Sequence, residues 1–192
     1  MKRIVTIQDI SCLGKCSLTV ALPIISATGV ECCIVPTAVL STHTGFPNFT
    51  FDDLTDQIEP ISAHWKEQGF KFDAIYTGYL GSYEQLDLMG KFFDEHGTQS
   101  NLVFADPAMG DYGNLYPGFN EEFAVAMGQK VCSKADIIVP NMTEAAFMLQ
   151  IPYKEEGEYD EAYVKDLLVK LCGLGCEKAV ITGVSLEPGK CG

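Results

Sequence analysis

Residues 72–107, FDAIYTGYLGSYEQLDLMGKFFDEHGTQSNLVFADP, decide the fold class. A short apolar run at 72–78 is followed by an amphipathic segment at 82–97, for which Ser82 is the expected N-cap. A second short apolar run follows at 101–107. Strand, helix and strand in this order predict a βαβ unit with two parallel strands in one sheet.

The same alternation extends along the chain in both directions. Further strands are predicted at 3–9, 31–40, 135–141 and 177–183, although Pro36 disfavours the second of them. Helices are predicted at 17–29, 51–69, 120–133, 143–150 and 160–175, with Ser17 as a possible N-cap of the first. This pattern predicts an α/β fold with a mostly parallel central sheet and helices on both faces. No repeat or linker interrupts it, so residues 1–192 are expected to form a single domain.

Composition limits the partners. The net charge of −13 and the pI of about 4.5 argue against nucleic acid or an anionic membrane as the main partner. The sequence has no apolar stretch of about 18 residues, and the apolar run of its N-terminus is too short for a signal peptide. We therefore expect a cytoplasmic protein.

The eight cysteines do not predict a metal site. Cys12 and Cys16 share a Cys-x₃-Cys spacing with Cys172 and Cys176, and structural zinc usually has tighter pairs. Several of the cysteines lie in apolar segments, where cysteine packs as a small hydrophobic residue. We expect reduced, mostly buried thiols.

Polar residues gather in two loops that follow predicted strands, where open α/β sheets bind their ligands. DPAMGD (106–111) holds Asp106 and Asp111, and PNMTEA (140–145) holds Asn141 and Glu144. Carboxylate and amide oxygens suit Mg²⁺ with bound phosphates. An equally good interpretation has Asn141 or Thr143 as a helix N-cap, with Glu144 in the first turn.

The loop DISCLGKCSLT (9–19) contains a Gly-Lys pair but is not a Walker phosphate-binding loop. Asp9 stands where the first Walker glycine belongs, and Cys16 stands in place of Ser or Thr. The loop STHTGF (41–46) contains His43, and a single loop histidine more often makes a structural hydrogen bond than performs catalysis.

Six motifs in order, IQD (7–9), STHTGF, TGYLGS (77–82), DPAMGD, PNMTEA and VITG (180–183), resemble the pyridoxal/pyridoxamine kinases of the ribokinase-like superfamily. The resemblance implies a ribokinase-like three-layer sandwich. It also implies ATP-dependent phosphorylation of the 5′-hydroxymethyl group of pyridoxal, pyridoxamine or pyridoxine. The alternatives are a hydroxymethylpyrimidine kinase on the same scaffold, and a non-catalytic module that binds a vitamer or a nucleotide.

The resemblance also implies roles for particular residues. Those near Mg²⁺ and the ATP phosphates are Asp106, Asp111, Asn141, Glu144 and Thr182, with Asp106 and Glu144 facing the metal. Those near the substrate are Thr44 and Tyr79 at the pyridine ring, His43 close by, and Asp9 or Ser11 at the ring nitrogen or hydroxyl. A homodimer is expected by resemblance alone.

One family feature has no counterpart in this sequence. In the resembling kinases a Gly-rich turn, whose Asp is the catalytic base, and an adenine-binding segment come after the VITG motif. Neither is found before Gly192. We therefore expect a domain that is incomplete at its C-terminus, a base beyond Gly192, and no measurable turnover by residues 1–192 alone.

Overall fold

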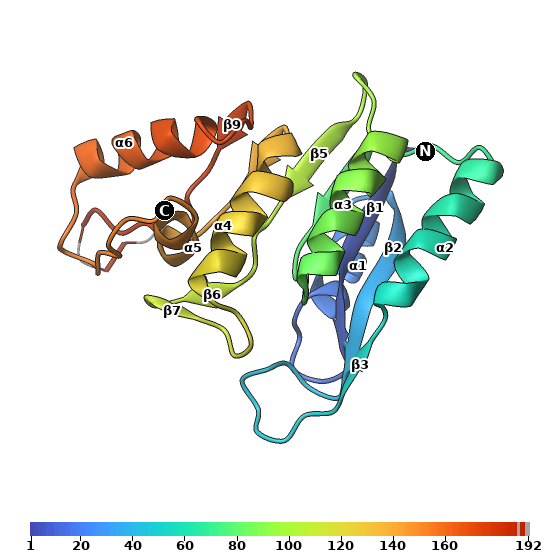
Figure 1. Ribbon diagram of the computed structural model, residues 1–192, viewed down its shortest axis with the longest axis horizontal. Coiled ribbons are helices and arrows are strands. Elements are labelled where there is room, and N and C mark those ends of the chain that lie inside the picture. Colours follow the sequence, from blue (N-terminus) through green and yellow to red (C-terminus); the bar gives the residue numbers. More distant parts are fainter. Residues whose placement is uncertain (188, 191–192) are drawn as a thin grey trace. The chain divides into compact units, whose positions relative to one another are not determined.

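The computed structural model describes residues 1–187 and 189–190 and contains two compact units, Met1–Phe104 and Ala105–Gly192 (Figure 1). Strands and helices alternate in both units, and most strand pairs are parallel. The predicted α/β fold class is confirmed. The single-domain organisation stays a prediction.

The sheet of the first unit is built around β1 (Arg3–Ser11). It pairs in parallel with β2 (Glu31–Leu40) on one side and with β4 (Ala74–Thr77) on the other. The strand order is β3-β2-β1-β4-β5, with β3 (Phe51–Asp53) antiparallel at one edge and β5 (Leu102–Ala105) at the end of the unit. The central strand is mostly buried, as expected for a sheet covered on both faces.

Helices cover both faces of this sheet (Figure 1). Helix α1 (Leu18–Ala27) lies on one face, and α2 (Thr55–Glu67) and α3 (Tyr83–His96) pack together on the other. The predicted N-cap of α3 is confirmed, because Ser82 Oγ accepts a hydrogen bond from the Gln85 N–H. Ser17 occupies the N-cap position of α1, as predicted, but it has a φ of 52° and its side chain makes no capping bond.

Two local predictions in this unit need correction. Residues 51–53 form β3 rather than the start of a helix, because they pair with the end of β2, and the helix begins only at Thr55. Pro36 does not interrupt β2. It pairs with Gln8 of β1, whereas the described pairing with β3 starts at Ala38, so Pro36 lies where β2 pairs on one side.

The described residues of the second unit combine short strands with three α-helices. Its elements are β6 (Gly110–Asp111), β7 (Asn114–Leu115), α4 (Glu121–Lys130), a 3₁₀ turn at Cys132–Lys134, β8 (Ile137–Ile138), α5 (Met142–Met148), α6 (Glu161–Cys172) and β9 (Lys178–Ala179). Strands β8 and β9 are parallel and shorter than predicted. The antiparallel β6–β7 hairpin has no counterpart in the sequence-based prediction.

The cysteines are less buried than expected. Of the seven in the described part of the chain, all free, Cys132 and Cys176 are buried, whereas Cys12 and Cys16 are exposed. The expectation of mostly buried thiols is wrong because Cys12 and Cys16 lie in the loop after β1, outside the packed elements. Across residues 1–187 and 189–190 no helix has the length and apolarity needed to cross a membrane.

Candidate functional site

The first turn of α5 is a reciprocal capping box. Asn141 Oδ1 accepts a hydrogen bond from the Glu144 N–H at 3.0 Å, and Glu144 Oε2 accepts one from the Asn141 N–H at 2.8 Å. The capping interpretation of PNMTEA is therefore confirmed. It does not exclude a ligand role, because the same two side chains also reach the DPAMGD loop.

That loop is fastened to α5 through its backbone. Asn141 Nδ2 donates to the Gly110 carbonyl oxygen at 2.8 Å, and the Met109 N–H donates to Glu144 Oε1 at 3.1 Å. Two loops that are separate in the sequence thus form one hydrogen-bonded group at the ends of β5 and β8. This brings Asn141 and Glu144 together with the loop that carries Asp106 and Asp111.

Glu144 is buried, with 3% of its surface exposed. Burial raises the pKa of its carboxyl group to about 8, the N–H groups of Asn141 and Met109 oppose that shift, and the Asp106 carboxylate adds to it. At pH 7 Glu144 is therefore mostly protonated. A nearby cation would favour the ionised form and lower this pKa.

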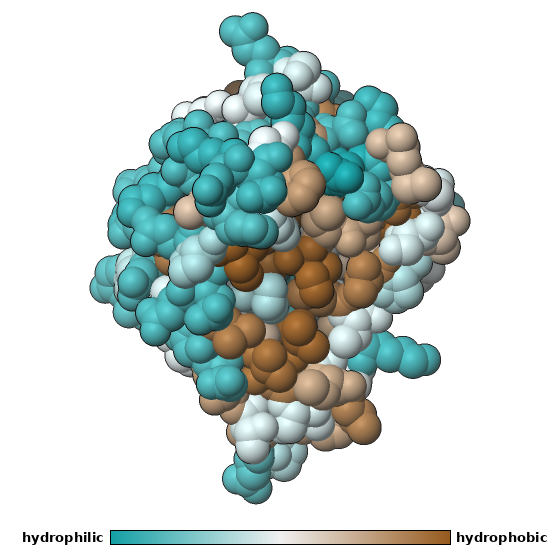
Figure 2. Space-filling view, turned by 90° about the vertical axis from the view of Figure 1, so that its right-hand side faces the viewer, coloured by the Kyte–Doolittle hydropathy of each residue, from teal (hydrophilic) through white to brown (hydrophobic). Residues whose placement is uncertain are grey.

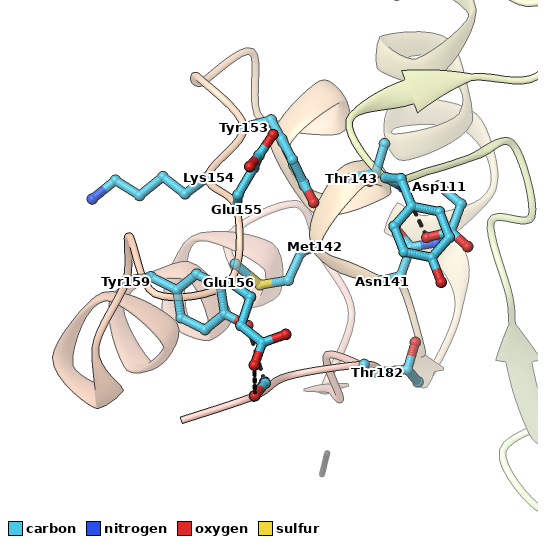
Figure 3. A pocket seen from close by; sticks show the side chains of 13 residues that line it. Asp111, Asn141, Met142, Thr143, Tyr153, Lys154, Glu155, Glu156, Tyr159 and Thr182 are labelled. Atoms are coloured by element: carbon cyan, nitrogen blue, oxygen red, sulfur yellow. Dashed lines mark hydrogen bonds between the residues drawn. The ribbon is translucent and has the colours of Figure 1, made fainter. Parts of the chain in front are cut away.

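Asp111, Asn141 and Thr182 line one pocket of about 380 Å³ (Figure 3). Asn141 forms an isolated parallel bridge with Thr182, whose N–H donates to the Pro140 carbonyl at 2.9 Å. Glu144 and Asp106 do not line the pocket. No group of three His, Cys, Asp or Glu side chains is arranged to hold a metal ion anywhere in the described ranges. Mg²⁺ at such a pocket would take further oxygen ligands from water and from the phosphates that it accompanies.

A second group of polar residues lies in the first unit, at the carboxyl end of β1. Asp9 and Ser11 are 4% and 1% exposed, and Ser11 Oγ donates to Asp9 Oδ2 at 2.9 Å. Burial raises the pKa of the Tyr79 phenol, and the charges of Asp9 and Asp53 raise it further, so Tyr79 lies within the field of Asp9. Three of the predicted substrate-side residues are thus near neighbours.

His43 belongs to the same region through the loop that follows β1. A Cβ on Gly14 would overlap the His43 ring, and Gly14 has a φ of +118°, so this close approach requires glycine. His43 Nδ1 accepts the Gly45 N–H at 3.1 Å, and Thr44 between them is half-buried. The structural interpretation of His43 as a hydrogen-bonding loop residue is therefore correct. Whether it also meets a substrate stays a prediction.

The sequence analysis did not identify two residues of these regions as candidates. The Thr42 hydroxyl is buried and is the one such side-chain atom in the described chain without a hydrogen-bond partner. Its place in STHTGF was the available signal. Tyr153 lies against the β6–β7 hairpin and lines the pocket, and no sequence motif marks it.

The chain is similar to known kinases. The sequence profile described as phosphomethylpyrimidine kinase matches residues 22–191. A pyridoxal kinase of Arabidopsis thaliana is 28% identical over 193 residues, which cover 96% of this chain and 59% of that protein. The chain likewise spans 61% of a pyridoxal kinase of Dictyostelium discoideum.

Solved structures are similar over nearly the whole chain. A Bacteroides thetaiotaomicron protein crystallised with pyridoxal is 41% identical with a TM-score of 0.92, covering 98% of this chain and 65% of that one. The pyridoxal kinase from Lactobacillus plantarum is 30% identical with a TM-score of 0.88, covering 100% and 67%. These likenesses confirm the ribokinase-like fold expected from the motifs.

Proposed function

The chain belongs to the phosphomethylpyrimidine kinase family, and from that premise we propose that it carries the vitamer-binding and Mg-nucleotide-binding residues of a pyridoxal kinase. The reaction is ATP-dependent phosphorylation of the 5′-hydroxymethyl group of pyridoxal, pyridoxamine or pyridoxine. The observation that carries the proposal is the polar pocket lined by Asp111, Asn141 and Thr182, next to the buried carboxyl of Glu144. The names of the relatives from Arabidopsis and Lactobacillus support the choice of substrate.

On the nucleotide side, the residues fit phosphates that arrive with Mg²⁺. Asp111 is an exposed carboxylate at the pocket, and Asn141 and Thr182 offer an amide and a hydroxyl beside it. The bound ion would neutralise phosphate charge, which is the main requirement of phosphoryl transfer besides positioning. Asp106 and Glu144 do not line the pocket, and a cation bound there would favour the ionised form of Glu144, whose pKa burial raises.

On the vitamer side, Tyr79 offers an aromatic ring and Asp9 a buried carboxylate. A buried charge is costly unless it is paired. The Ser11 hydroxyl donates one hydrogen bond to Asp9, and a protonated pyridine nitrogen or a ring hydroxyl of the vitamer would supply another. Thr44 and His43 would complete the polar contacts from the 41–46 loop.

The competing substrate is hydroxymethylpyrimidine, because the family profile takes its name from the phosphorylated pyrimidine. Isothermal titration calorimetry of the 192-residue chain distinguishes the two. We expect pyridoxal and pyridoxamine to bind, hydroxymethylpyrimidine to bind at least about tenfold more weakly, and Tyr79→Ala to weaken vitamer binding while Mg-ADP binding is kept. Tighter binding of the pyrimidine alcohol would refute the assignment.

We also infer that two copies associate through the uncharged, exposed side of α1. Helix α1 (LTVALPIISA) has no charged residue, and Leu18 is its one buried residue, while Leu22 and Ile24 are 36% and 60% exposed. Figure 2 faces the side where β2 and α2 lie and shows an apolar area among hydrophilic ones. Since each chain carries −13, copies would repel least where charge is absent.

Sedimentation equilibrium tests this association. The wild-type chain should sediment as a dimer, and Ile24→Glu should shift it towards monomer with vitamer binding unchanged. A monomeric wild type at micromolar concentration would refute the inference. The expected cytoplasmic localisation stays a prediction.

A further inference from the structure

We propose that Tyr153, acting with Thr143, is a positioning residue that clamps the β6–β7 hairpin and thereby fixes Asp111 at the nucleotide pocket. The proposal deepens the proposed function and rests on it. Neither the motifs nor the family resemblance assigned a role to Tyr153.

The hairpin is too small to hold its own shape. Its two strands have two residues each, joined by a turn in which Tyr112 and Gly113 have φ angles of 49° and 76°. Positive φ at both central residues is typical of a type I′ turn. An isolated two-stranded hairpin is marginally stable at best in water. The orientation of Asp111, the residue before this turn, therefore depends on contacts from outside the hairpin.

The inner contacts come from the first turn of α5. The Gly113 N–H donates to Thr143 Oγ1 at 2.9 Å, and Asn141 Nδ2 donates to the Gly110 carbonyl at 2.8 Å. Thr143 is 1% exposed, so its hydroxyl is held in place by packing. The turn and the strand before it are thus each fastened by one side chain.

Tyr153 supplies a further contact. A Cβ placed on Gly113 would lie 2.8 Å from Tyr153 Cδ1, which means that the ring lies directly against the turn. The Thr143 side chain lies close enough to the Tyr153 hydroxyl to oppose the rise of its pKa, and the Tyr153 ring points towards Thr143 (Figure 3). Burial raises the pKa of the Tyr153 phenol, and the charges of Glu155 and Asp111 raise it further. Tyr153 therefore contacts the turn and its anchor, and lies within the field of the Asp111 carboxylate.

The expected consequence is preorganisation. Asp111 is exposed, and its Oδ1 accepts the Tyr112 N–H at 2.9 Å within the turn itself. If the turn moves, the carboxylate moves with it. A hairpin held on both sides keeps the Asp111 carboxylate in one place before Mg²⁺ and phosphate arrive. Less ordering of the hairpin is then required on binding.

The experiment measures ADP affinity by calorimetry with and without Mg²⁺, using the full 192-residue chain. Tyr153→Ala should reduce the Mg²⁺-dependent gain in ADP affinity by about tenfold, and Tyr153→Phe, which keeps the ring, by less. The matched control is Tyr163→Ala, a tyrosine that contacts Lys154 of the same segment but lies outside the pocket, and it should leave the gain unchanged. Pyridoxal affinity should stay constant throughout.

A double-mutant cycle separates positioning from a general loss of stability. If Tyr153 acts through Asp111, Tyr153→Ala should hardly reduce the Mg²⁺-dependent gain in ADP affinity in an Asp111→Asn background. An equal loss in both backgrounds, or an undiminished Mg²⁺-dependent gain in Tyr153→Ala, would overturn the proposal.

Amide hydrogen exchange of the ligand-free chain distinguishes failure of the Tyr153 proposal from failure of the proposed kinase function. Tyr153→Ala should speed exchange at residues 110–115 more than elsewhere. If exchange rises there but the wild type binds no Mg-ADP, the clamp stands and the kinase assignment fails. If exchange at 110–115 is unchanged, the clamp is refuted whatever the nucleotide result.

Discussion

Replacement of Glu144 by Gln tests whether burial raises the pKa of this carboxyl group. Gln is close to the protonated acid in shape and lacks its ability to ionise. Burial raises the pKa of Glu144 from its ordinary value of 4.5 to about 8. The folded chain therefore holds a proton that the unfolded chain releases between these two values.

The sign and size of the effect follow from proton linkage. Between pH 4.5 and pH 8 the folded state binds one proton more at Glu144 than the unfolded state, so the free energy of unfolding falls as pH rises, by about 1.4 kcal/mol per pH unit. The stabilising contribution is complete below pH 4.5 and is lost once pH exceeds about 8. Over the whole interval the loss is on the order of 5 kcal/mol.

Urea unfolding at several pH values measures this difference. We expect the free energy of unfolding of the wild type to fall faster than that of Glu144→Gln between about pH 5.5 and 7.5, by about 1.4 kcal/mol per pH unit. Above about pH 8.5 the two curves should run parallel. Other titrating groups are common to both proteins and cancel in the comparison.

Glu144→Gln also loses an acceptor, because its amide nitrogen cannot accept one of the two bonds from Met109 and Asn141. That loss lowers the stability of the variant at every pH and does not change the slope. Parallel curves from pH 5.5 to 7.5 would therefore refute the reasoning, whatever the offset between them.

Three further predictions concern proton release, the β1 loop and a helix cap. Mg-ADP binding at pH 7 should release close to one proton, because a cation ionises Glu144, and calorimetry in buffers of different ionisation enthalpy should show this release lost in Glu144→Gln. Gly14→Ala should weaken pyridoxal binding, because the added Cβ would overlap the His43 ring. Gly29→Ala is the control, since the space around Gly29 is open, and it should leave pyridoxal affinity unchanged. Equal pyridoxal affinities of the two variants would count against the loop assignment. Ser82→Ala should lower the free energy of unfolding by about 1 kcal/mol through loss of its bond to Gln85, and Ser17→Ala, whose side chain caps nothing, by much less.

The sequence by itself determined the fold class and the order of the candidate motifs along the chain. Periodicity and apolar runs are local properties, and the 72–107 unit shows them clearly, so β4, α3 and β5 were placed within a few residues. The motifs DPAMGD and PNMTEA follow strands, and parallel strands place their carboxyl ends at one edge of a sheet. Their neighbourhood was therefore predictable before any side chain was placed.

Tertiary structure decided the rest. The β6–β7 hairpin has strands of two residues, too short for any periodic signal. Its turn contacts Thr143 and Tyr153, which lie 30 and 40 residues after Gly113 in the chain. The raised pKa of Glu144 likewise comes from burial and from Asp106, neither of which the capping motif reveals. Hairpin geometry and proton affinity depend on which distant groups surround a residue, and that is fixed only when the chain has packed.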